Sequence, residues 1–315
     1  MDDREINPPT FSQGIEPLIL AAKPQDVLEG GGIKIQKLKD YFEKRDDVVM
    51  AFLFGSQAEE RAHQESDWDI AVYFKPEMAR VEWEELGREY PEEDHVWSSC
   101  ADIVETEHLD LIVLNRAPAT IADSAIHGEP LVIKDRKLFL DFMLIITRAA
   151  EDFRAYVKDY YEIYERSHSL SDRDAERLRT IILFLEEQIS HYKDFASLTE
   201  EEYMDNFMKR GAVERWVENI MNAAVDISKI ILASEKRLIP RAYRESMKQA
   251  LRNLHMPEEY TDKFDMWVKI RNEFAHEYLD IKWKKISVFI RESERSITQY
   301  AEAVKQFLET KKEHQ

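Results

Sequence analysis

The chain has 315 residues, of which 44% are hydrophobic and 34% charged, a composition typical of globular proteins with more than one domain. No apolar run approaches the roughly 18 residues that a membrane span requires, and the acidic amino terminus has no apolar secretory segment. The single Cys100 excludes an internal disulfide, and no Cys/His cluster has zinc spacing. We therefore expect a cytoplasmic protein.

The net charge of −19 is unevenly distributed. Residues 1–165 contain 18 basic and 36 acidic side chains, whereas residues 166–315 contain 26 and 27. The first half would repel a nucleic-acid backbone, so contact with a polynucleotide is expected in the second half.

The chain begins with a Pro- and Gly-punctuated segment, 1–32, which predicts an irregular arm. Apolar spacing over 33–45 then predicts an amphipathic helix. The apolar run Val48–Phe54 is typical of a strand, and it stops at Gly55-Ser56. A Gly turn after a strand exposes backbone N–H groups and a hydroxyl that can receive phosphate oxygens.

A second strand-like run follows, and it carries Asp67 and Asp69. Side chains alternate along a strand, so the two carboxylates share a face while Trp68 and Ile70 point into the core. Adjacent carboxylates repel each other and do not stabilise a strand. Mg²⁺, which is held by one or two carboxylates and by substrate phosphates, explains them.

The next segments are less regular. Residues 76–90 are acidic and predict a helix, and residues 91–100 predict a loop. Residues 109–115 then predict a third strand, with Asp110 on the same face as Ile112.

Gly55-Ser56, ten residues, then Asp67-Trp68-Asp69 resembles the signature of the minimal nucleotidyltransferases of the polymerase β-like superfamily. The resemblance implies an α+β domain with a small mixed sheet and flanking helices, using ATP and Mg²⁺. It also implies a third acid on the neighbouring strand, which completes the metal site or takes a proton from the acceptor. Asp110 is the favoured candidate; Asp102 competes but is expected to cap a helix.

Two further features bear on this resemblance. The family commonly has basic residues and a second Gly after Gly-Ser, whereas this chain has Gln57, Ala58, Glu59 and Glu60. The missing positive charges should weaken affinity for a triphosphate. Residues 117–136 resemble the end of the family's domain, where a short helix leads through a Gly to a small strand.

A long helix is expected over 137–166, and a polar break follows it. We therefore predict a nucleotidyltransferase domain over 33–166 and an all-α helical bundle over 167–315. Helical spacing in the second domain predicts helices at 177–192, 212–235, 241–254, 260–278 and 283–308.

The fourth of these helices carries a polar stripe. Arg271 and Tyr278 lie two turns apart on nearly one face, and Asn272 and His276 share the neighbouring face. Arg271 and His276 diverge on a straight helix, so a shared site is easier to build where two copies meet across a twofold axis.

These residues resemble the R-N-x3-H-x-Y form of the HEPN domain motif. HEPN domains are small helical bundles, usually dimeric, and many are metal-independent ribonucleases. The resemblance implies a homodimer with His276 as general acid or base at an RNA 2′-hydroxyl. Arg271 would stabilise the charge of the phosphorane, and Asn272 would orient both groups.

A group of basic residues precedes that helix. Basic residues recur at three- and four-residue steps along one face of the helix predicted over 241–254: Arg241, Arg244, Lys248 and Arg252. They predict either an RNA-binding stripe or an ordinary solvated face.

Together the two resemblances imply a fused toxin–antitoxin protein. In that family the nucleotidyltransferase transfers AMP from ATP to the Tyr of the HEPN motif, here Tyr278, and silences the ribonuclease. One alternative is an aminoglycoside nucleotidyltransferase, because the acidic first domain could attract a cationic antibiotic. Another is a nucleotide-binding sensor with little catalysis, which Glu59 and Glu60 favour.

Overall fold

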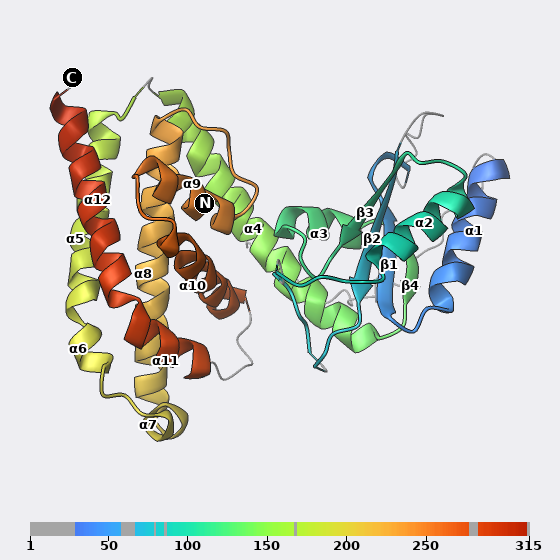
Figure 1. The fold of residues 1–315 in the computed structure, drawn as a ribbon, viewed down its shortest axis with the longest axis horizontal. Helices are drawn as coiled ribbons and strands as arrows, with labels where there is room; N and C mark the ends of the chain where they lie inside the picture. The colour runs from blue at the N-terminus through green and yellow to red at the C-terminus, as the bar shows by residue number, and fades with distance from the viewer. Residues whose placement is uncertain are drawn as a thin grey trace, which may run out of the picture.

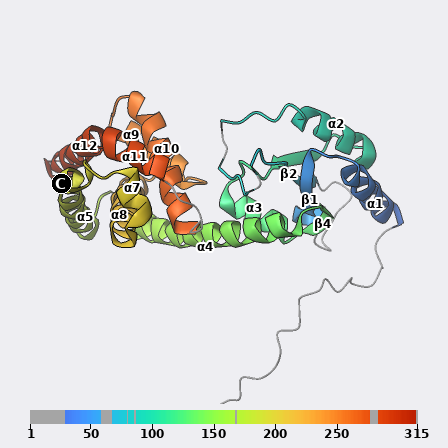
Figure 2. The same ribbon diagram turned by 90° about the horizontal axis from the view of Figure 1, so that it is seen from below.

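A computed structural model describes residues 29–57, 67–78, 80–84, 87–166, 169–276 and 283–313. The chain forms a part built on a sheet and a part built of helices, and the helix α4 (Arg136–Arg166) runs from one into the other (Figure 1). In the view of Figure 2, α4 runs along one side of both parts. Within the described ranges, no helix is long and apolar enough to span a membrane.

Within the described residues, a four-stranded mixed sheet organises the first part. Its strands are β1 (Val48–Phe54), β2 (Trp68–Phe74), β3 (Leu109–Val113) and β4 (Glu129–Ile133), in the order β3-β2-β1-β4. β1 is antiparallel to β2 and β4, whereas β2 and β3 are parallel. The expected small mixed sheet is confirmed.

Helices cover both faces of the sheet, which is why β1 and β2 are apolar almost throughout. On one face, α1 (Glu29–Glu43) and α2 (Glu93–Val104) pack against the core that contains Trp68 and Ile70. On the other face, α3 (Ala119–Ile126) and the first half of α4 cover Tyr73. The predicted short helix, Gly and strand over 117–136 correspond to α3, Gly128 and β4.

Three local predictions in this part are wrong. No helix occurs over 76–90 in the residues described there, because Trp83 and Tyr73 hold this segment to the domain through hydrogen bonds to backbone groups. The expected loop over 91–100 is helix α2, whose buried Val96 and Cys100 lie one turn apart. Asp102 does not cap a helix; it is exposed inside α2.

Helix α1 begins at Glu29 and not at residue 33, so the helix includes glycines that had predicted an irregular arm. Residues 1–28, the greater part of that arm, lie outside the described residues.

Helix α4 contributes to two cores. Phe142 and Ile146 pack on the sheet, whereas Tyr156 and Tyr160 pack among the helices that follow. The helix thus fixes the first part against the second. The domain boundary expected after residue 166 stays a prediction.

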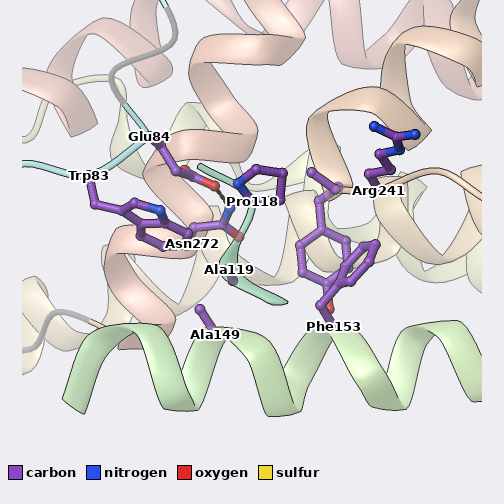
Figure 3. A pocket seen from close by; sticks show the side chains of 10 residues that line it. Trp83, Glu84, Pro118, Ala119, Ala149, Phe153, Arg241 and Asn272 are labelled. Carbon is purple, nitrogen blue, oxygen red and sulfur yellow. Dashed lines mark hydrogen bonds between the residues drawn. The ribbon is translucent and has the colours of Figure 1, made fainter. Parts of the chain in front are cut away.

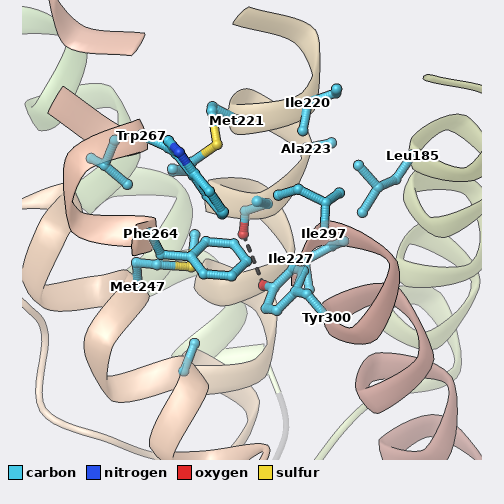
Figure 4. Packing of buried hydrophobic residues seen from close by; sticks show 14 of the residues in the cluster. Leu185, Ile220, Met221, Ala223, Ile227, Met247, Phe264, Trp267, Ile297 and Tyr300 are labelled. Atoms are coloured by element: carbon cyan, nitrogen blue, oxygen red, sulfur yellow. Dashed lines mark hydrogen bonds between the residues drawn. The ribbon is translucent and has the colours of Figure 1, made fainter. Parts of the chain in front are cut away.

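The second part is the expected helical bundle. It contains α5 (Asp172–Ser190), α6 (Tyr192–Phe195), α7 (Glu200–Asp205), α8 (Phe207–Ser234), α9 (Tyr243–Asn253), α10 (Glu259–His276), α11 (Trp283–Glu292) and α12 (Glu294–Glu313). Helix α8 lies at its centre and contacts α5, α9 and α10. Figure 4 shows Phe264, Trp267 and Tyr300 packed against α8, with the Tyr300 hydroxyl 3.0 Å from that of Ser228.

The single helix expected over 283–308 is divided at Ser293 into α11 and α12. The buried Ser293 hydroxyl donates to the Phe289 carbonyl, a bond that competes with the helical ladder and bends helices. It also lies 2.6 Å from the Tyr192 hydroxyl, which packs the bend against α6.

Candidate functional site

The predicted acids of the first domain lie at one end of the sheet. Asp67 directly precedes β2, Asp69 is its second residue, and Asp110 is the second residue of β3. Asp69 and Asp110 are register partners in the parallel pair, so their side chains lie on the same face. Asp69 is half-buried, whereas Asp67 and Asp110 are exposed. The register thus places Asp69 and Asp110 on one face, whereas Asp67 lies outside the strand and the shared metal site stays a prediction.

The electrostatics of the cluster reflect this proximity. Burial raises the pKa of the Asp69 carboxyl, and the negative charges of Asp110 and Asp67 raise it further. A cation beside Asp69 would relieve both effects. His108 adds a nitrogen 3.5 Å from an Asp67 oxygen, with both side chains mostly exposed.

Only glycine fits at position 55, because of both its backbone conformation and its surroundings. Its φ of +69° is in the left-handed region, and a Cβ at this position would collide with the Asp69 carboxyl. Because Phe54 is the register partner of Asp69, the turn Gly55–Gln57 starts beside the acids. Ser56 follows, half-buried. Ala58, Glu59 and Glu60 lie outside the described residues.

The donor set fits Mg²⁺, which takes oxygen ligands and usually keeps one or two carboxylates with water and phosphate. The missing Cβ at Gly55 makes room for the Asp69 carboxyl itself, which therefore lies directly against the turn. In the part of the chain that the structure describes, no group of three or more His, Cys, Asp or Glu side chains is close enough to hold a metal by itself. A bound phosphate would therefore have to complete the shell.

The second set of predicted residues lies on α10. Arg271 is buried and donates from Nε to Asn222 (2.7 Å) and from Nη1 to Asp152 (2.6 Å). Its guanidinium also lies over the Tyr243 ring, 4.7 Å from the centroid. This side chain therefore ties α10 to α4, α8 and α9.

Asn272, also buried, accepts a 3.2 Å hydrogen bond from Arg271 and donates a 2.7 Å bond to the Glu84 carboxyl. His276 is the last residue of α10, and nothing further is described of its side chain. Tyr278 lies outside the described residues. The structure thus brings Arg271 and Asn272 together and leaves the geometry of His276 and Tyr278 as a prediction.

Glu84 is a residue that the sequence did not single out. It belongs to the segment expected to be helical, and its φ of 63° is left-handed. Burial raises its pKa to about 7, against the hydrogen bond from Asn272 and the charges of Arg244 and Lys269, while Glu273 raises it further. No local pattern signals this contact, because Glu84 and Asn272 are 188 residues apart.

The four basic residues over 241–252, of which Arg241 precedes α9, do not form one solvated stripe. Arg244 forms an ion pair with Asp265 and donates to the Glu84 carbonyl (3.3 Å), so it faces the first domain. Arg241, Lys248 and Arg252 remain exposed.

Comparison with known families agrees with both domains. Residues 36–137 match the family described as polymerase beta, nucleotidyltransferase, and residues 185–304 match the family described as ribonuclease HepT-like. No curated protein matches the chain. The first match contains Gly55 and the three acids, and the second contains Arg271 to Tyr278. The chain is therefore a nucleotidyltransferase domain of polymerase β type fused to a HepT-like HEPN domain.

Proposed function

We propose that the first domain transfers AMP from ATP to Tyr278 and thereby silences a ribonuclease in the second domain. The observation that carries this proposal is the register pairing of Asp69 with Asp110 beside Gly55, in a chain that continues into a HEPN domain. A nucleotidyltransferase site and its candidate acceptor are thus covalently linked, which raises the effective concentration of the acceptor.

The residues divide the transfer between them. Gly55 and Ser56 receive the β- and γ-phosphates of ATP, and Asp67 and Asp69 would hold Mg²⁺ against those phosphates. The ion, when bound, neutralises charge on the phosphates. Asp110 takes the proton of the acceptor hydroxyl, whose oxygen then bonds to the α-phosphorus while the bond to pyrophosphate breaks. The products are a tyrosine–AMP phosphodiester and pyrophosphate.

The ribonuclease reaction needs no metal. His276 takes the proton of an RNA 2′-hydroxyl, whose oxygen bonds to the adjacent phosphorus while the bond to the 5′-oxygen breaks, and the 5′-oxygen leaves with a proton from water. Arg271 stabilises the charge on the phosphorane, and Asn272 orients both groups. AMP on Tyr278, two residues from His276, adds bulk and a negative charge that repel an RNA backbone. A homodimer through the HEPN domain would bring two copies of α10 together.

Cleavage of a single-stranded RNA, measured before and after incubation with ATP and Mg²⁺, tests this function. Wild-type protein should lose cleavage on incubation, Tyr278→Phe should retain it, and His276→Ala should lack it throughout. Equal loss of cleavage in wild type and Tyr278→Phe would refute silencing through Tyr278. Nucleotidylation of an aminoglycoside instead of the protein would favour the antibiotic-modifying alternative.

A further inference from the structure

A segment of the nucleotidyltransferase domain reaches the HEPN motif. Two neighbouring residues anchor it: the Trp83 indole donates to the Ala117 carbonyl (2.9 Å), and the Glu82 backbone N–H donates to the Tyr73 hydroxyl (2.8 Å). Glu84 follows with a left-handed φ that turns its side chain away from the sheet domain and toward α10. The placement of Glu84 is thus determined by the first domain.

The second domain receives Glu84 at two points. Asn272 Nδ2 donates to its carboxyl (2.7 Å), and Arg244 donates to its backbone carbonyl (3.3 Å). Figure 3 shows Glu84 and Asn272 facing each other between Trp83 and Pro118. The cavity left beside them is about 30 Å³, too small for a nucleotide. The Asn272 amide is therefore enclosed where the two domains meet.

Arg271 also donates a hydrogen bond to an acid outside the bundle helices. Its Nη1 donates to Asp152 of α4, the helix that continues from the sheet domain. The acidic partners of the HEPN pair Arg271 and Asn272, which are Asp152 and Glu84, thus both precede the bundle helices, whereas Asn222 of α8 also accepts from Arg271. An RNA phosphate would therefore compete with Glu84 for Asn272 and with Asp152 for Arg271.

We propose that Glu84 is a built-in inhibitor of the HEPN site, which occupies Asn272 and closes the contact between the two domains until RNA or domain separation displaces it. The inference rests on the proposed ribonuclease function. It adds a second level of control that needs no nucleotide transfer, because contact between the domains alone restrains the site.

The groups around Glu84 determine how firmly it is held. Lys269 and Arg244 attract its carboxylate, although Arg244 is shared with Asp265. Glu273 repels it and is itself paired with Lys285. Removing the carboxyl should therefore loosen this contact and leave the ion pairs of its neighbours in place.

Glu84→Ala and the matched control Glu77→Ala test the inference. Glu77 is an exposed acid on the same segment, and its described ion pair, to Arg88, spans 3.3 Å. Both are made in the Asp69→Asn background, which keeps Tyr278 unmodified. The readouts are cleavage of a fluorescent single-stranded RNA, binding of its 2′-O-methyl analogue, and amide hydrogen exchange of α10.

Glu84→Ala should raise RNA cleavage and analogue binding about tenfold, the shift expected when one buried hydrogen bond is lost, and should speed exchange in α10. Glu77→Ala should match its parent. If the parent cleaves RNA and Glu84→Ala is no faster than Glu77→Ala, the inhibitory role is wrong and the ribonuclease stands. If no protein binds or cleaves RNA, the ribonuclease assignment fails and the inhibitory role fails with it.

Discussion

Gly55→Ala is the substitution for which the structure gives the clearest physical expectation. A left-handed conformation costs a residue with a Cβ about 1–2 kcal/mol. In addition, the new methyl group would collide with the Asp69 carboxyl, so either the turn or the acid must move. We expect Gly55→Ala to lower the free energy of unfolding by about 1–3 kcal/mol, the range for strain at a special φ combined with a local clash.

The effect on catalysis should exceed the effect on stability. Displacing Asp69 by about 1 Å costs on the order of 100-fold in rate when a group must be held in a reactive geometry. Pyrophosphate release from ATP and Mg²⁺, together with urea unfolding, measures the two effects separately.

Gly32→Ala is the matched control, because Gly32 is helical and a Cβ there meets nothing within 4 Å. It should raise stability by about 0.5–1 kcal/mol, since Gly is unfavourable inside a helix, and leave pyrophosphate release unchanged. If Gly55→Ala were as stable and as active as Gly32→Ala, the cradle beside Asp69 would not form the site.

Three further predictions follow from the charged contacts. Asp69→Asn should abolish pyrophosphate release yet raise the free energy of unfolding in urea at neutral pH. Because folding raises the pKa of Asp69, this gain in stability should shrink as the pH falls and the wild-type carboxylate becomes protonated. Asp152→Ala should lower the free energy of unfolding by about 1–3 kcal/mol, because it leaves the buried Arg271 without its carboxylate partner. The range allows for Asp152 being itself about one-third exposed. Glu151→Ala, which changes an exposed neighbour on α4, should be neutral in the same unfolding assay. The raised pKa of Glu84, about 7, means that its protonated form stabilises the domain contact and that this contribution is lost as the pH rises through that value. Hydrogen exchange of α10 in wild type should therefore speed up across neutral pH beyond the intrinsic rate, whereas Glu84→Gln should show no such transition.

Local patterns predicted the sheet end of the first domain well. The apolar runs of β1 and β2, the turn at Gly55 and the alternation that aligns Asp69 with Asp110 are all encoded within short stretches. Periodicity of two fixes the face of each side chain, so the meeting of the acids needed only the correct pairing of β2 with β3.

Helix α2 was missed because its buried residues are few. Val96, Cys100 and Val104 form a stripe one residue wide among polar neighbours, which is narrower than a usual amphipathic face. The segment before it was mistaken for a helix because its acidic composition favours helices, whereas the hydrogen bond of Trp83 to Ala117 anchors it to the domain as an irregular segment. Tertiary contacts overrode local propensity there.

The contact between the domains could not be predicted from the sequence. Glu84 and Asp152 meet the HEPN pair across 188 and 119 residues, and a single acid in an acidic chain carries no signal of its partner. The motif on α10 identified Arg271 and Asn272 but not the side chains that hold them.

Peptide mapping by mass spectrometry, after incubation of the full chain with ATP and Mg²⁺, tests the central claim most directly. The account predicts one or more AMP groups on Tyr278 in wild type and none in Asp69→Asn. Pyrophosphate release without AMP on Tyr278 would contradict it.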